Sequence, residues 1–257
     1  MRNGAILDRA LSPEWLDTAL RIAAQEGQAG HWRDILDVSL REDIPAPEAR
    51  DKTLVALSHV WFTPPAMAEP MIHWAIGTAP TLDDTRPLHV GALLATYPFF
   101  GDVCAAVGRM TALGQPAHTP EIRRRVRERW GDRQTVDVAA RRCIRTLRSL
   151  GLLVGDAGSS TSRPAVRLKV PRALRAWLVH ALLLSRGIDA VDEREVRKAP
   201  ELFGLDLPPG GQGHEYPFIE RHTEGGGRTV LTRRSTPPSP PRPHSSARES
   251  AQLALDL

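Results

Sequence analysis

A helix-like stretch that runs directly into a short apolar segment constrains the fold of this chain more than any other feature. On a helical wheel, with about 100° per residue, residues 134–150 separate into two faces. The apolar face holds Val136, Ala139, Ala140, Cys143, Leu147 and Leu150, with Ile144 at its edge. The opposite face holds Gln134, Val138, Arg141, Arg145 and Arg148. Gly151 is a suitable helix stop. Segments 152–154 and 165–170 are predicted strands on either side of a polar loop, so an amphipathic helix precedes a β-hairpin.

The segments before this helix predict further helices. Residues 88–110 are mostly apolar and are interrupted by Pro98, which predicts either two short helices or one kinked helix. Thr119 and Pro120 then suit the N-cap and first position of a helix that ends at Gly131. The narrow apolar stripe of that helix is Ile122, Val126 and Trp130, and the rest of its surface is rich in Arg123, Arg124, Arg125, Arg127 and Arg129. Such a helix is either a binding surface or an ordinary solvated helix.

The net charge of +4 is unevenly distributed along the chain. Residues 1–87 contain 8 basic and 13 acidic side chains, whereas residues 119–170 contain 13 basic and 5 acidic ones, a local net charge of +8. A basic block beside an acidic one indicates contact with nucleic acid through the basic block. Arginine outnumbers lysine 31 to 3 throughout, so the position of the charge is more informative than the choice of arginine.

The order of elements over residues 88–170 resembles the winged helix-turn-helix domain, a DNA-binding module. The run RRCIRTLRSLGLLV at 141–154 is similar to the junction between recognition helix and wing in that superfamily, where the leucines and the Gly-Leu-Leu close the core. The resemblance implies that residues 134–150 enter the major groove of double-stranded DNA. It implies base contacts from Gln134, Val138, Arg141 and Arg145, and phosphate contacts from Arg148, Arg123, Arg124 and Arg127. It also implies that the wing offers Ser159, Ser160, Thr161, Arg163 and Arg167 to the DNA.

The regions around this domain are less informative. Helices are expected at 11–26, 31–40 and 47–62 in an acidic N-terminal domain (1–87), where four tryptophans most simply fill a helical core. The central domain extends over 88–187 with a strongly apolar helix at 171–187, which either packs on the domain or forms the seam of a homodimer. Residues 188–231 form a small accessory region, and the Pro/Ser/Arg-rich residues 232–257 are expected to be a disordered tail. The predicted fold is mainly α with a small β wing.

The last six residues, QLALDL, resemble the bacterial sliding-clamp-binding motif. The residues that match its four defining positions are Gln252, Leu253, Leu255 and Leu257. Short apolar motifs at the end of polar tails commonly order on binding a partner. The alternative is a short terminal element that packs back on the body of the protein.

Several function classes lack support in the sequence. Cys104 and Cys143 have no partners at metal-ligand spacing and lie in apolar helical patterns, so we expect two buried thiols, no metal and no cofactor. No phosphate-binding loop, dinucleotide motif or nucleophile elbow is present, so no residue can be given a catalytic role. No apolar run is long enough for a membrane span and no signal peptide is evident, which favours a cytoplasmic bacterial protein.

The expected function is therefore DNA binding, by a transcriptional regulator or a DNA-targeting accessory subunit. A non-enzymatic adaptor in a larger assembly is the main alternative, because winged helices also bind proteins. An enzyme with its site in residues 188–231 is the third reading.

Overall fold

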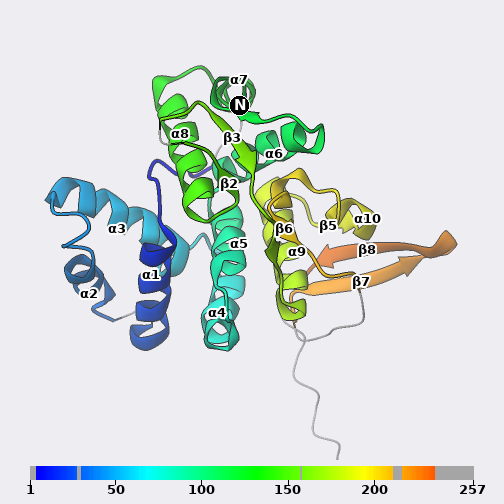
Figure 1. Cartoon of the computed structure of the whole chain (residues 1–257). Helices are drawn as coiled ribbons and strands as arrows, with labels where there is room; N and C mark the ends of the chain where they lie inside the picture. The colour runs from blue at the N-terminus through cyan, green and yellow to red at the C-terminus, as the bar shows by residue number, and fades with distance from the viewer. Residues whose placement is uncertain (1–3, 28–29, 157, 211–215, 235–257) are drawn as a thin grey trace, which may run out of the picture.

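The computed structural model describes residues 4–27, 30–156, 158–210 and 216–234. In that part of the chain the protein is mainly helical, with three small sheets (Figure 1). The first helices are α1 (Pro13–Glu26), α2 (Trp32–Ser39), α3 (Pro47–Trp61) and α4 (Glu69–Thr78). The first three confirm the expected N-terminal helices. Ser12 caps α1, where its hydroxyl accepts a hydrogen bond from the Trp15 backbone at 3.3 Å.

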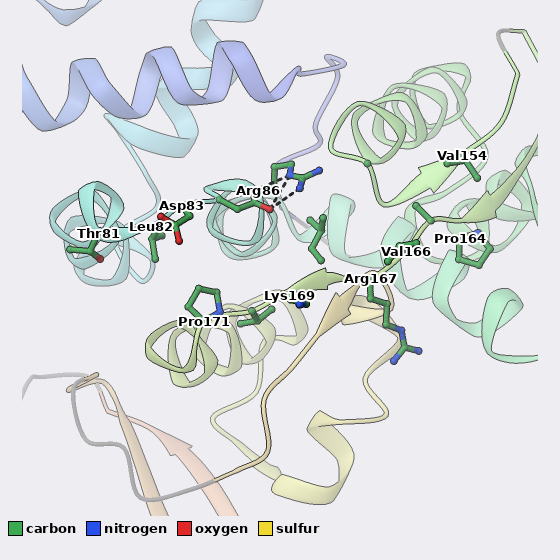
Figure 2. A pocket seen from close by; sticks show the side chains of 15 residues that line it. Thr81, Leu82, Asp83, Arg86, Val154, Pro164, Val166, Arg167, Lys169 and Pro171 are labelled. Atoms are coloured by element: carbon green, nitrogen blue, oxygen red, sulfur yellow. Dashed lines mark hydrogen bonds and ion pairs between the residues drawn. The ribbon is translucent and has the colours of Figure 1, made fainter.

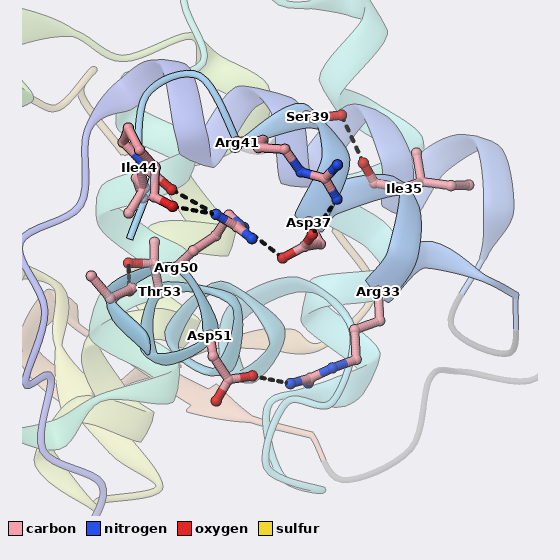
Figure 3. Close-up of polar contacts among 11 residues, drawn as sticks. Arg33, Ile35, Asp37, Ser39, Arg41, Ile44, Arg50, Asp51 and Thr53 are labelled. Carbon is pink, nitrogen blue, oxygen red and sulfur yellow. Dashed lines mark hydrogen bonds and ion pairs between the residues drawn. The ribbon is translucent and has the colours of Figure 1, made fainter. Parts of the chain in front are cut away.

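A network of polar contacts holds α2 against α3 (Figure 3). Arg50 donates to Asp37 at 2.6 Å and to the Ile44 carbonyl at 2.8 Å, and Arg33 pairs with Asp51 at 2.5 Å. Some of the acidic side chains of the N-terminal region therefore form ion pairs within the protein.

The apolar residues 88–110 form two helices that meet at an angle of 116°, α5 (Arg86–Thr96) and α6 (Pro98–Ala112). This is the two-helix alternative, and Pro98 takes the first position of α6, where its missing N–H is harmless. No single helix in the described residues is long and apolar enough to cross a bilayer. Taken together, α5 and α6 are long and apolar enough to span a bilayer, but they form a bent pair and not a single helix.

The middle of the chain combines three helices with a three-stranded sheet. Its elements follow the order α6, β1 (Ala117–His118), α7 (Thr119–Trp130), α8 (Gln134–Ser149), β2 (Leu153–Val154) and β3 (Thr161–Pro164). Strand β3 is central and antiparallel to both β1 and β2. Gly131 and Gly151, at φ of +90° and +74°, end α7 and α8 as predicted. The N-cap of α7 is His118, one residue before the predicted Thr119.

The predicted returning strand at 165–170 is wrong. The strand that returns antiparallel to β2 is β3, and the loop before it is correspondingly shorter. Backbone hydrogen bonds explain the difference: the N–H groups of Leu168 and Val170 donate to the carbonyls of Gly204 and Asp206. Residues 168–169 therefore form β4 (Leu168–Lys169), which pairs in parallel with β6 (Leu205–Asp206) in a different sheet.

The C-terminal part packs on α9 (Arg172–Arg186) and adds β5 (Ala190–Asp192), α10 (Glu193–Val196), β7 (Ile219–Glu224) and β8 (Arg228–Arg233). The last sheet has the order β5-β8-β7. The predicted start of the tail at 232 is too early, because Thr232 pairs with both Ala190 and Glu220. The rest of that tail, from 235, lies outside the described residues.

One continuous cluster of buried side chains runs from Leu7 to Leu231 and includes residues on both sides of positions 87 and 187. The apolar residues of α9 lie inside it, so this face packs within the chain rather than on a second copy. Of the N-terminal tryptophans, Trp61 is fully buried and the others pack partly buried against the cluster. The domain boundaries stay a prediction.

Candidate nucleic-acid interface

A groove of about 530 Å³ lies between the N-terminal end of α7, the outer face of α8 and the loop before β3. Its lining side chains and backbone belong to Thr119, Pro120, Arg123, Arg141, Ile144, Arg145, Arg148, Gly158, Ser159 and Ser160. Four of these residues are arginines, and none is acidic. We call it the arginine groove. The positive end of the α7 dipole adds to the favourable environment for an anion.

The amphipathic character of α8 presents arginines to this groove. Every residue of its predicted apolar face is buried, with no more than 3% of any of them exposed, as the helical wheel predicts. Arg141 and Arg145 consequently lie exposed on the other side and form no ion pair with a described residue. They are free to bind an external anion.

Arg148 has a different role from its neighbours on α8. Its guanidinium donates to Ser162 Oγ at 2.9 Å and to the carbonyls of Ser159 and Thr161 at 2.8 and 3.2 Å. These bonds attach the loop before β3 to α8. Arg148 therefore positions the loop, and its capacity to bind a phosphate is largely used.

The arginines of α7 are also engaged inside the protein. Asp137, in the first turn of α8, accepts hydrogen bonds from both Arg123 and Arg127. These bonds hold the pKa of the Asp137 carboxyl far below its usual range. Arg124 binds Glu121 at 2.7 Å and also binds Glu128. Hydrogen bonds from Arg124 and Arg125 lower the pKa of Glu121 to about 2.

The other predicted site residues are scattered around the groove. Gln134 is exposed at the start of α8 and Val138 is half-buried, and neither lines the groove. Arg163 is exposed on β3, whereas Arg167 lies beyond that strand and lines two other cavities. Ser159 and Ser160 line the arginine groove.

Contacts from the N-terminal segment to α8 were not anticipated from the sequence. Thr146 accepts a hydrogen bond from the Leu11 backbone at 2.9 Å, and Arg142 donates to the Asp8 carbonyl. Nothing in the local pattern indicates partners 134 or more residues away. These bonds fix the back of α8 while its front stays open.

A larger cavity of about 1150 Å³ lies between residues 81–86 and 164–171 (Figure 2). Arg86, which is labelled in Figure 2, lines this cavity and pairs with Asp84 at 2.7 Å. The walls mix both signs of charge with exposed apolar side chains such as Val166. This mixture favours no particular ligand, so the arginine groove is the better candidate.

Residues 252–257, with the predicted clamp motif, lie outside the described part of the chain. Among the described residues, no group of three or more His, Cys, Asp or Glu side chains could hold a metal ion. Cys104 and Cys143 are buried, and burial raises the pKa of both thiols. Comparison with protein-family models, curated proteins and solved structures finds no match to this chain.

Proposed function

We propose that this protein binds double-stranded DNA through a winged helix-turn-helix formed by α6 to β3, as a transcriptional regulator or a DNA-targeting accessory subunit. The observation that carries the proposal is the arginine groove, where four arginines and a helix N-terminus meet without an acidic side chain. Such a surface favours a polyanion with regularly spaced phosphates.

The arrangement of the elements supports the same proposal. A winged helix places a small antiparallel sheet beside three helices, with a loop that projects next to the recognition helix. The order α6, β1, α7, α8, β2, β3 and the strand order β1-β3-β2 agree with that scheme. In it, α8 enters the major groove, and the described residues Gly158, Ser159 and Ser160 before β3 belong to the wing.

The contacts within the protein favour some arginines over others for the proposed DNA contact. Arg141 and Arg145 project freely from α8 and are the main candidates, with Gln134 and Val138 nearer the helix start for base contacts. Arg163 on β3 extends the basic surface. Arg148, Arg123 and Arg127 act mainly by holding the wing and α7 in place.

A salt series of DNA binding with an Arg141→Ala/Arg145→Ala variant tests the proposal. Log Kobs of the natural protein should fall with log salt concentration by about 0.9 per phosphate contacted. The double variant should bind at least about tenfold more weakly and reduce that slope by about 2. Both arginines are exposed and unpaired among the described residues, so folding should be unaffected.

An Arg21→Ala/Arg172→Ala variant is the matched control. It removes the same charge from two exposed positions away from the groove. It should retain the binding of the natural protein. Equal binding by the two double variants, or a natural protein that does not bind duplex DNA, would contradict the proposal.

The sequence of the last six residues favours a second binding partner. We expect residues 252–257 to bind the bacterial sliding clamp, because Gln252 and the three leucines match its docking motif. Deletion of these six residues should reduce capture by immobilised clamp to background and leave DNA binding unchanged. Deletion of 240–245, in the same Pro/Ser/Arg-rich tail, should preserve capture. Equal recovery with and without the motif would refute the clamp contact.

A further inference from the structure

A second basic groove, of about 730 Å³, lies at the other end of β3 from the arginine groove. It is bounded by the C-terminal end of α6, the residues after β3 and the segment 197–207. Its cations are Arg109, Arg167, Arg197 and Lys198. All four are exposed, and none forms an ion pair with a described residue. Asp206 is the one carboxylate among the described residues that line it.

A close backbone approach creates this groove. A Cβ added to Gly108 on α6 would lie 2.0 Å from the Pro200 carbonyl oxygen, so only glycine permits this contact. The contact brings the segment that carries Arg197 and Lys198 against the end of α6, next to Arg109. Cations from three separate parts of the chain are thereby gathered on one surface. Such a concentration of unpaired charge is unfavourable unless an anion is bound or solvent screens it.

Strand β3 connects the two grooves. The loop before it lines the arginine groove through Ser159 and Ser160, and Pro164 at its end lines the second groove. Four residues of strand span about 13 Å. Arg163 is exposed between the two ends. One turn of duplex DNA is about 34 Å long, so a bound duplex that extends past the wing is long enough to meet both grooves.

We propose that the second basic groove binds phosphates of the duplex that flanks the segment read by α8. This inference rests on the proposed DNA-binding function and extends it. Base edges are not required, because free cations in an open groove contact the sugar-phosphate backbone without sequence preference. The flanking contact increases affinity for long duplexes and does not alter the preferred sequence.

The test compares two duplex lengths with an Arg109→Gln/Arg197→Gln/Lys198→Gln variant. Duplexes of about 8 and about 30 base pairs, roughly 27 and 100 Å long at about 3.4 Å per base pair, share the same central sequence. When centred on α8, the shorter duplex reaches only about 13 Å to either side, so it ends short of the second groove, whereas the longer duplex passes it. On the longer duplex the triple variant should bind about tenfold more weakly and reduce the salt slope by about 3. On the shorter duplex it should bind like the natural protein. An Arg21→Gln/Arg172→Gln/Arg194→Gln variant removes three exposed charges outside both grooves and should match the natural protein on both lengths.

A long duplex offers more non-specific binding positions than a short one. The ratio of variant to natural affinity at each length removes this difference, because it affects both proteins equally. A ratio near one at both lengths, with binding that still depends on Arg141 and Arg145, would overturn this inference and leave the proposed function intact. An equal loss at both lengths, shared by the control triple variant, would show a general charge effect and also overturn it. A loss confined to single-stranded RNA of 30 nucleotides would assign the groove to RNA instead. Absence of DNA binding by the natural protein would overturn the proposed function itself.

Discussion

Replacement of Asp137 by alanine is expected to lower the free energy of unfolding by about 2–3 kcal/mol. Asp137 is 12% exposed and accepts hydrogen bonds from Arg123 and Arg127, which tie α7 to the first turn of α8. Its removal leaves Arg123 without a counter-ion among the described residues and Arg127 with only the exposed Asp132. Loss of one partner from a fully buried ion pair costs about 3–5 kcal/mol. The expected value is smaller because Arg123 and Arg127 are 26% and 35% exposed.

The same contact makes stability depend on pH in the acidic range. Because the folded-state pKa of Asp137 is lowered, its contribution is complete above the ordinary aspartate pKa of about 3.9 and is lost as pH falls below it. Urea denaturation of Asp137→Ala and of the natural protein at pH 7 and pH 3 measures both effects. Asp132→Ala is the matched control, since Asp132 is 83% exposed and 3.4 Å from Arg127, and it should change stability by less than about 0.5 kcal/mol. Similar losses in the two variants would rule out the special role of Asp137.

An Asp137→Asn variant separates stability from binding. It preserves the size of the side chain and removes the charge that neutralises Arg123 and Arg127. Arg123 lines the arginine groove, and Arg127 lies one turn further along α7. The freed arginines should therefore raise duplex affinity at low salt by a few fold and steepen the salt slope by about 1–2, even though the protein is less stable.

Features with a short-range cause could be predicted from the sequence. The two faces of α8 follow from helical periodicity, and all the residues assigned to its apolar face are buried. Ser12 caps α1 because capping involves residues three positions apart. The glycines that end α7 and α8 are favoured by positive φ, which is a property of the residue itself.

Features with a long-range cause could not be predicted. The strand predicted at 165–170 failed because Leu168 and Val170 bond to residues more than 30 positions later. Arg148 was expected to contact phosphate, yet its bonds depend on a loop whose path is set by β1–β3 pairing. The pairing of Arg124 with Glu121 and Glu128 is local and could have been inferred from the helical spacing. The contact of Arg123 with Asp137 joins two different helices, α7 and α8, and could not have been inferred in this way.

The second basic groove could not be predicted from the sequence either. Arg109, Arg167 and Arg197 are far apart in the sequence, and a local charge count does not bring them together. Their proximity depends on the contact between α6 and the segment at Pro200. The arginine groove, in contrast, is formed mostly by two consecutive helices and the hairpin that follows. Its basic character is therefore visible as a block in the sequence.

His180 is expected to make the protein about 3 kcal/mol less stable at pH 4 than at pH 6.5. The side chain is 2% exposed on α9, where its Nδ1 shares a hydrogen bond of 2.5 Å with the Tyr216 hydroxyl. Phe218 packs beside both rings, and the other ring nitrogen, Nε2, has no hydrogen-bond partner among the residues that the structure describes. Burial, with a smaller contribution from the charge of Arg233, lowers the pKa of His180 to about 4.

The sign of the effect follows from proton binding. Between pH 4 and 6.5 the unfolded chain protonates this histidine, with a pKa of about 6.5, while the folded protein keeps it neutral. Protons therefore stabilise the unfolded state, and the free energy of unfolding falls as pH decreases across this range. A His180→Leu variant should lose this part of the slope, equivalent to about one proton near pH 5, even if the unpaired Tyr216 hydroxyl makes it less stable at every pH. His222→Leu, in which the replaced histidine is 50% exposed, is the matched control for the loss of an imidazole from the surface. Chemical denaturation of all three proteins from pH 4 to 7 measures the free energy of unfolding at each pH. Parallel plots of this free energy against pH for His180→Leu and the natural protein would show that His180 is protonated in the folded state.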